Sequence, residues 1–187
     1  MKHLIYLLLF FPWLVIGQSN SQKEEASSNK EVSKKMVASS ISSHFNSKVI
    51  SAYTNQSEQL ITDFYAYLTL YPQAESEALQ KELDKSIQQM FLSETILVED
   101  FISGSNKKIK LLELLQYCKE NKFVVSVNNI QNTSVNATNF DMRYQLLVTN
   151  NAETKTYNFT QKVYLFPVEK QFGNIKKTIW ELKLGEF

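Results

Sequence analysis

The chain has 187 residues, of which 43% are hydrophobic and 21% are charged. This is long and apolar enough for one globular domain with its own core, and it excludes a disulfide mini-protein and a charged disordered chain. The 20 lysine and arginine residues stand against 19 aspartate and glutamate residues, and Arg143 is the only arginine. Nucleic-acid-binding proteins concentrate such cations to neutralise phosphates, so we expect no nucleic-acid partner.

The first 17 residues have the pattern of a secretory signal peptide. Lys2 precedes an unbroken apolar run from Leu4 to Ile16, after which a polar stretch begins. A helix of this length rises only about 20 Å, against roughly 30 Å for the core of a bilayer, so we expect no stable membrane span. We therefore predict cleavage before Gln18 and export to the periplasm or to the medium.

A polar tether is predicted over residues 18–40, where serine, lysine and glutamate dominate the sequence. A single folded domain is expected to cover residues 41–187, with its core at 57–184. Between Val32 and Tyr53 apolar residues recur every four or five positions, and this spacing favours a weak helix that overlaps the end of the tether.

Two clearer helices are predicted before the first strand. Asn55 or Ser57 can cap the first of them, because a short side-chain oxygen accepts hydrogen bonds from the free amides of the first turn. Pro72 then ends this helix after Tyr71. The second helix covers about residues 74–91, and its apolar positions fall on one stripe, so we expect it to lie on the core.

The pattern changes to β after Ser93. A short strand is predicted at residues 94–101, followed by a turn at 103–106 and a helix at 107–121. Four longer strand-like runs close the chain, at residues 123–130, 140–149, 155–166 and 176–184. The polar segments between these runs are predicted to be turns. In the last run, Trp180 is predicted to be a buried core residue because apolar residues alternate there.

Helices followed by long antiparallel strands predict an α+β domain, in which N-terminal helices pack on a curved antiparallel sheet. Three segments carry this order: EQLITDFYAYLTLY (58–71), IQQMFLSETILVEDF (87–101) and KKTIWELKLGEF (176–187). In this order the chain resembles the nuclear transport factor-like superfamily, also called cystatin-like or SnoaL-like. The resemblance implies a cone of helices and sheet around an internal cavity, and it implies no single function.

Few residues are available for catalysis or for binding a cofactor. After cleavage the chain would keep His44 as its only histidine and Cys118 as its only cysteine, so no zinc-type spacing exists and no metal is expected. The remaining glycines form no phosphate loop or dinucleotide fingerprint, so no cofactor is expected. Cys118 lies in an apolar helical stretch without a neighbouring base, and we interpret it as a core residue.

Asp63 is the candidate catalytic residue. The predicted apolar arc of its helix contains Leu60, Phe64, Tyr67 and Tyr71. At 100° per residue Asp63 falls on this arc, beside Tyr67. A carboxylate desolvated there would be suited to act as a general base, and the Tyr67 hydroxyl can hydrogen-bond the same substrate. The alternative is that Asp63 lies at the rim of the arc and reaches water.

Other polar side chains are weaker candidates. Asp100, near the end of the first predicted strand, is either a second candidate carboxylate or a residue that flanks the following turn. Several tyrosines can offer hydroxyl groups to a ligand, and the alternative is that they are core aromatics with hydrated tips. These tyrosines are Tyr53, Tyr65, Tyr67, Tyr144 and Tyr164.

Three functions remain open from the sequence. The absence of a catalytic cluster favours a non-catalytic exported module that binds a small apolar ligand or a protein partner through its cone or its exposed sheet face, where a homodimer can also form. The first alternative is an isomerase- or dehydratase-type enzyme that uses a buried carboxylate, Asp63, together with Tyr67. The second alternative is a scaffold domain of a cell-envelope complex, held by an uncleaved leader.

Overall fold

The computed structural model describes residues 40–105, 107–150 and 153–187. All of them lie in one compact unit of the chain, Val37–Phe187. The predicted signal peptide, nearly all of the predicted tether and the start of the weak helix predicted from Val32 lie outside the described residues. None of the helices in the described part combines the length and the apolar character that are needed to cross a membrane.

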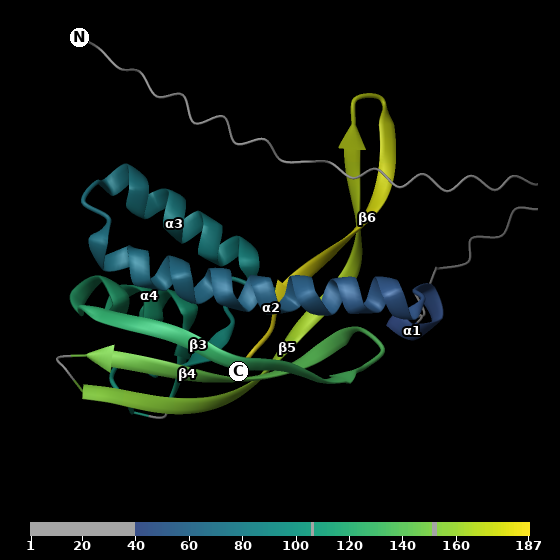
Figure 1. Cartoon of the computed structure of the whole chain (residues 1–187). Helices are drawn as coiled ribbons and strands as arrows, with labels where there is room; N and C mark the ends of the chain where they lie inside the picture. Colours follow the sequence, from purple (N-terminus) through teal and green to yellow (C-terminus); the bar gives the residue numbers. More distant parts are fainter. Residues whose placement is uncertain (1–39, 106, 151–152) are drawn as a thin grey trace, which may run out of the picture. The chain divides into compact units, whose positions relative to one another are not determined.

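The described chain has an α+β fold, as predicted, with helices packed against a curved antiparallel sheet (Figure 1). Its helical elements are α1 (Ile41–His44), α2 (Ser47–Leu70), the short 3₁₀ helix η1 (Tyr71–Gln73), α3 (Glu77–Met90) and α4 (Leu111–Glu120). Its strands are β1 (Leu97–Glu99), β2 (Lys108–Lys110), β3 (Phe123–Val135), β4 (Asn139–Asn150), β5 (Glu153–Phe172) and β6 (Ile175–Leu184). β1 pairs with β2, and β3 to β6 pair in sequence order.

Helix α2 begins earlier than the sequence predicted. Its N-terminal cap is Asn46, whose side chain accepts a hydrogen bond of 3.0 Å from the backbone N–H of Val49. Neither Asn55 nor Ser57 is a cap, because both lie inside the helix. Ser57 is accommodated there because its hydroxyl donates to the carbonyl oxygen of Tyr53 at 2.8 Å, one turn earlier.

The connection between α2 and α3 agrees with the sequence prediction. Pro72 lies in η1, directly after the end of α2, where it cannot continue the helix. Ser76 caps α3 by accepting a hydrogen bond of 3.2 Å from the N–H of Leu79. The buried residues of α3 are Leu83 and Ile87, so this helix packs on the core through a narrow stripe.

The four strands of the large sheet are longer than predicted, β1 is shorter than the predicted strand at 94–101, and one strand was missed. Residues 131–135 continue β3 and residues 167–172 continue β5, although both segments were predicted to be turns. The turn between β5 and β6 is reduced to Gly173 and Asn174, and Gly173 adopts a φ of 61°, which glycine tolerates without strain. Residues 108–110 form β2 instead of the first turn of a helix, because their backbone pairs with β1.

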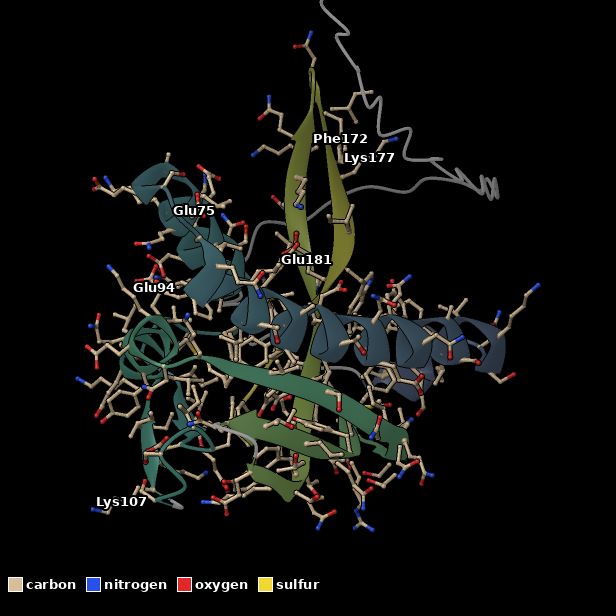
Figure 2. All side chains as sticks on the ribbon, turned by 60° about the vertical axis from the view of Figure 1, so that its left-hand side comes forward. Glu75, Glu94, Lys107, Phe172, Lys177 and Glu181 are labelled. Atoms are coloured by element: carbon tan, nitrogen blue, oxygen red, sulfur yellow. The ribbon has the colours of Figure 1, made fainter. Side chains whose placement is uncertain are left out.

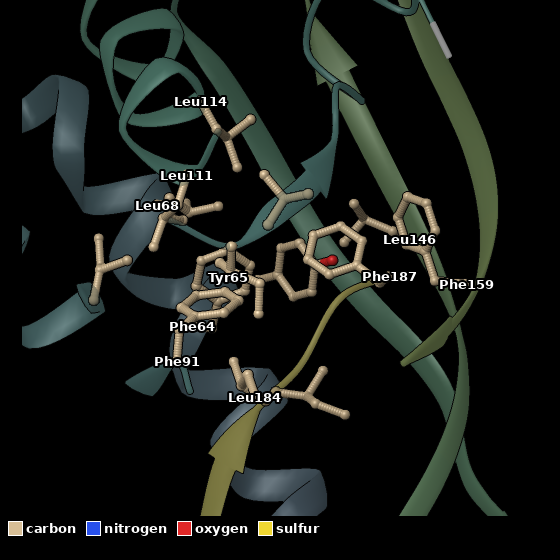
Figure 3. Close-up of a cluster of buried hydrophobic side chains, with 14 of the residues drawn as sticks. Phe64, Tyr65, Leu68, Phe91, Leu111, Leu114, Leu146, Phe159, Leu184 and Phe187 are labelled. Carbon is tan, nitrogen blue, oxygen red and sulfur yellow. The ribbon is translucent and has the colours of Figure 1, made fainter. Parts of the chain in front are cut away.

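The core lies between α2 and the inner face of the sheet, and Figure 3 shows its aromatic centre. α2 contributes Ile61, Phe64, Tyr65 and Leu68. Alternate residues of β4 and β5 face them, namely Met142, Tyr144, Leu146, Phe159, Gln161, Val163 and Leu165. The ring of Phe187 also lies in this cluster, with its centroid 5.1 Å from that of Phe159. Helix and sheet thus share one continuous apolar interior.

Trp180 lies on the inner face of β6 and packs against the core, as predicted, but it is half-buried and not fully buried. Its ring packs edge-on against Phe45 at a centroid distance of 5.0 Å and lies 5.3 Å from the ring of His44. The physical reason is the length of the sheet. The inner face of β6 is fully buried at Leu184, and Trp180 lies at the edge of the core, against the start of the helices.

This difference in burial predicts a difference in stability. We expect Phe64→Ala to lower the free energy of unfolding by about 3 to 5 kcal/mol, because it empties a fully buried site, and Trp180→Ala to lower it clearly less. Urea unfolding of the two variants measures both values. Equal losses would mean that Trp180 contributes as much to the core as Phe64.

Candidate functional site

Asp63 lies on the side of α2 that faces away from the core. The buried face of the helix is centred near Ile61, Tyr65 and Leu68. At 100° per residue, Asp63 is about 150° around the helix from this centre. Its side chain is half-buried, and its Oδ1 atom accepts a hydrogen bond of 2.7 Å from Nε2 of Gln59, one turn earlier. A role for Asp63 as a base stays a prediction.

The predicted apolar arc of α2 was right for Phe64 and Tyr71, which are buried, but its centre was misplaced. Leu60 and Tyr67 are half-buried, whereas Ile61 and Tyr65 are fully buried. The reason is that α2 contacts α3, α4 and three strands of the sheet, so apolar side chains occupy most of its circumference. Periodicity alone therefore does not single out one face. Tyr67 lies one turn after Asp63, as predicted, on the same side of the helix.

Asp100 is buried in the turn that follows β1. It accepts hydrogen bonds from the N–H of Ser103 at 2.9 Å, from the hydroxyl of Ser105 at 2.8 Å and from the hydroxyl of Ser103. Burial raises the pKa of Asp100, but these hydrogen bonds outweigh it and hold the pKa below its usual range. The carboxylate of Asp100 therefore holds the turn together, which agrees with the interpretation of Asp100 as a residue that flanks this turn.

A chain of hydrogen bonds crosses the buried interior. Tyr144 donates from its hydroxyl to Oε1 of Gln161 at 3.0 Å, and Gln161 donates from Nε2 to the carbonyl oxygen of Gly185 at 3.1 Å. The hydroxyl of Tyr65 therefore donates to that of Tyr144, at 3.0 Å. Burial raises the pKa of both tyrosines, so both remain neutral donors. Sequence reasoning assigned no role to Gln161, although a glutamine among alternating apolar strand residues is a signal of a buried polar contact.

Aromatic rings fill the space between α2 and the sheet, where the resemblance implies a cavity. The centroid of the Tyr144 ring lies 5.8 Å from those of Tyr65 and Phe159, and Phe159 lies 6.4 Å from Phe101. Two open surface pockets of about 540 and 550 Å³ lie beside α3 and beside the residues that follow β6. Neither pocket is lined by Asp63 or by any part of α2.

Neither the cysteine nor the acidic side chains of the described residues form a further reactive or metal-binding group. Cys118 is fully buried, and burial raises the pKa of its thiol, which makes it a poor nucleophile. Among the residues that the structure describes, no group of three or more His, Cys, Asp or Glu side chains is placed to hold a metal ion.

The second half of β5 and most of β6 leave the sheet as a two-stranded ribbon, which we call the arm (residues 165–182). β5 pairs with β4 as far as Tyr164, which lies opposite Asn139. From Val163 onward β5 pairs with β6. Figure 1 shows the arm projecting beyond the helices, and Figure 2 shows Phe172 and Lys177 near its free end.

The two faces of the arm have an inverted polarity. In the first half of β5 the outer face of the sheet is polar, with Thr156, Asn158, Thr160 and Lys162. In the arm the same outer face gains the apolar residues Phe166, Val168, Phe172, Ile175 and Ile179, beside the charged Lys170, Lys177 and Glu181. Of these side chains, Phe172 is 39% and Ile175 is 61% exposed. Near the free end of the arm the inner face carries the polar residues Glu169, Gln171, Lys176 and Thr178, whereas at its base this face keeps Leu165, Trp180 and Leu182.

Known proteins give no guide to the site. Comparisons of the chain with protein-family models, with curated proteins and with solved structures found no match. The outer face of the arm is the largest departure from the normal pattern of a half-buried sheet in the described residues, and it is our candidate site. The sequence does contain a signal of this site. Apolar residues of β5 occupy alternate positions up to Leu165, and at Phe166 and Val168 they move to the other set of alternate positions, where the predicted strand ends.

The buried hydrogen-bond chain leads to a prediction about stability. We expect Tyr144→Phe to lower the free energy of unfolding by about 1 to 3 kcal/mol, because it leaves the buried oxygen of Gln161 without a donor. Tyr65→Phe should cost less, since Tyr144 still donates to Gln161. Chemical unfolding of both variants measures the order, and a larger loss for Tyr65→Phe would contradict the assigned direction of the chain.

Proposed function

We propose that the protein is an exported, non-catalytic module that binds a protein partner through the outer face of the arm. The observation that carries this proposal is the inversion of polarity beyond Tyr164, which exposes Phe172 and Ile175 to solvent. Exposed apolar surface has a cost in water unless a partner covers it. An elongated ribbon that stands clear of the core offers such a surface without disturbing the fold.

The charges on the outer face indicate the chemistry of the partner. Lys170 and Lys177 lie opposite each other on this face, and Glu181 forms an ion pair of 2.5 Å with Lys170. Lys177 has no carboxylate within 4.0 Å among the residues that the structure describes. A partner that fits this face would present apolar side chains flanked by Asp or Glu.

The fold suggests why the binding surface lies outside the interior. We propose that the domain is a member of the nuclear transport factor-like superfamily, which the element order supports: two main helices, a short hairpin, a further helix and four antiparallel strands. In this chain Tyr65, Phe159 and Phe187 occupy the centre of the cone. A protein partner on the arm is therefore favoured over a small apolar ligand in the interior.

The two alternatives have weaker support. An isomerase- or dehydratase-type enzyme needs a desolvated carboxylate, and Asp63 is half-buried and bonded to Gln59. A scaffold domain of a cell-envelope complex would use the same arm and would differ in keeping its leader.

Export itself is supported by the signal-peptide pattern of the first 17 residues. Mass spectrometry of the exported protein distinguishes the binding module from the scaffold domain, because a mass that includes Met1 indicates an uncleaved leader.

Selection from a library of random displayed peptides tests the proposed function. We expect the wild-type protein to enrich peptides that combine apolar and acidic residues. The double variant Val168→Ser, Phe172→Ser removes two apolar side chains from the outer face, both on β5, and should bind the selected peptides at least about tenfold more weakly. Far-ultraviolet circular dichroism checks that the variant is folded.

A matched control removes an exposed apolar side chain elsewhere. Val124 on β3 is 60% exposed, so Val124→Ser should leave peptide binding unchanged. The proposal is wrong if no peptide is enriched, or if the arm variant and the control variant bind the selected peptides equally well.

A further inference from the structure

The free end of the arm carries two apolar side chains directly opposite each other. Phe172 and Ile175 form the last pair of the β5–β6 ladder, and only the turn at Gly173 and Asn174 lies beyond them. We call residues 172–175 the tip. Phe172 is 39% and Ile175 is 61% exposed, and both lie on the outer face. The arm therefore ends in an apolar tip that no other described part of the chain covers.

Two lysines lie directly behind the tip, one on each face of the arm. Lys176 and Lys177 follow Ile175 in β6, and at about 3.4 Å per residue they lie roughly 3 and 7 Å behind it along the strand. Lys176 lies on the inner face and Lys177 on the outer face. Among the residues that the structure describes, neither lysine has a carboxylate within 4.0 Å.

The acidic residues of the arm lie farther from the tip. Glu169 comes three residues before Phe172, which is roughly 10 Å along the strand. Glu181 comes six residues after Ile175, which is roughly 20 Å, and Figure 2 shows it closer to the base of the arm. Because Glu181 forms the ion pair with Lys170, the ammonium group of Lys170 is directed toward the base. The two cations nearest to the tip are thus the ones without an ion pair.

We infer that the tip inserts into the surface of a membrane that contains anionic lipids. The inference goes beyond the protein binding proposed above, because it gives the end of the arm a second kind of contact. Apolar groups that bind at a membrane interface are buried by roughly 5–10 Å at the boundary of headgroups and acyl chains. At this depth Phe172 and Ile175 contact the acyl chains, and Lys176 and Lys177 lie at the level of the phosphate groups. Each lysine held close to an anionic leaflet strengthens such binding.

The shape of the tip favours a lipid surface over a second protein site. Phe172 and Ile175 stand at the end of a narrow ribbon, and Figure 1 shows this end projecting away from the helices. A protein that buried such a projection would need a matching pocket, and it would have to take Lys176 and Lys177 out of water. A fluid bilayer closes around the projection, while the long lysine side chains keep their charged ends among the hydrated headgroups.

Co-sedimentation with phospholipid vesicles tests the inference, with protein recovered from cells that express the full chain. We expect the wild type to bind vesicles of phosphatidylcholine with about one-third phosphatidylglycerol, and to bind pure phosphatidylcholine vesicles at least about fivefold more weakly. Ile175→Ser removes the more exposed apolar side chain of the tip, and the double variant Lys176→Gln, Lys177→Gln removes both cations. Each should lower the partition into the anionic vesicles by about fivefold or more.

Each variant has a matched control elsewhere on the surface. Val124 is 60% exposed, so Val124→Ser matches Ile175→Ser in exposure. Lys119 and Lys122 are exposed and lie outside the arm, so the double variant Lys119→Gln, Lys122→Gln makes the same change of net charge. Both controls should partition like the wild type. A wild type that does not bind the anionic vesicles, or an Ile175→Ser variant that binds them equally well, overturns the inference.

A fluorescent label shows whether the tip itself enters the lipid. Cys118 is fully buried, so a thiol-reactive nitrobenzoxadiazole label attaches selectively to Phe172→Cys. Addition of the anionic vesicles should raise the emission of this label and shift it to the blue, because its surroundings become apolar. The same label on Val124→Cys should not respond. If the label at position 172 keeps its emission in water while the protein is bound to vesicles, another part of the chain makes the contact and the inference is wrong.

The two proposals fail separately. Peptide selection needs no lipid, and Val168→Ser alone should leave vesicle binding unchanged, because Val168 lies two ladder pairs behind the tip. A wild type that binds the selected peptides but no vesicles would refute the lipid contact and assign the tip to the protein site. A wild type that inserts its tip into vesicles but enriches no peptide would support the lipid contact and refute the proposed protein binding.

Discussion

The length of β5 is the constraint on which the rest of the structure depends. This strand has 20 residues, and it pairs with β4 along its first half and with β6 along its second half. Helix α2 and the short helices can cover only one part of so long a strand. Inner-face residues are therefore buried from Phe159 to Leu165, and they are polar and exposed at Glu169 and Gln171, beyond the core.

The buried hydrogen-bond chain fixes the point at which the two halves of β5 meet. Gln161 is the inner-face residue two positions before Val163, where pairing with β6 begins, and its side chain binds the backbone of Gly185 directly after β6. Tyr144 and Tyr65 extend this contact to β4 and to α2. A fully satisfied buried polar chain gives a core one defined arrangement. The base of the arm is thereby tied to the core, while its free end makes no comparable contact.

The sequence predicted those features that depend on local pattern. The α+β class, the helix stop at Pro72 and the alternation through Phe159 and Val163 all follow from periodicity and from turn chemistry. A short-range signal failed where the same side chain has another local partner. Ser57 looked like a cap but lies inside α2, because its hydroxyl bonds a carbonyl of the same helix.

The candidate site could be predicted only in part, for a related reason. Val168 and Phe172 belong to a segment whose proline and glycine are typical of a loop, yet cross-strand pairing with β6 keeps it extended. Asp63 was assigned to an apolar face because apolar residues of α2, among them Tyr67, lie next to it around the helix. Which side of α2 faces the core depends on how the sheet packs against it. The sequence of the helix alone does not show this. The inverted polarity of the arm becomes evident only when the partner strand is known.

Reaction of thiols with a small alkylating reagent, at low protein concentration, tests most directly whether the arm is an exposed ribbon. Cys118 is fully buried and is the only cysteine of the chain, so the wild-type protein should react only on unfolding. The thiol introduced by Phe172→Cys should react as fast as that of an unstructured peptide, because this position is near the free end of the arm. If this thiol is as protected as that of Cys118 in the folded protein, the arm packs against the rest of the chain and offers no free surface to a partner.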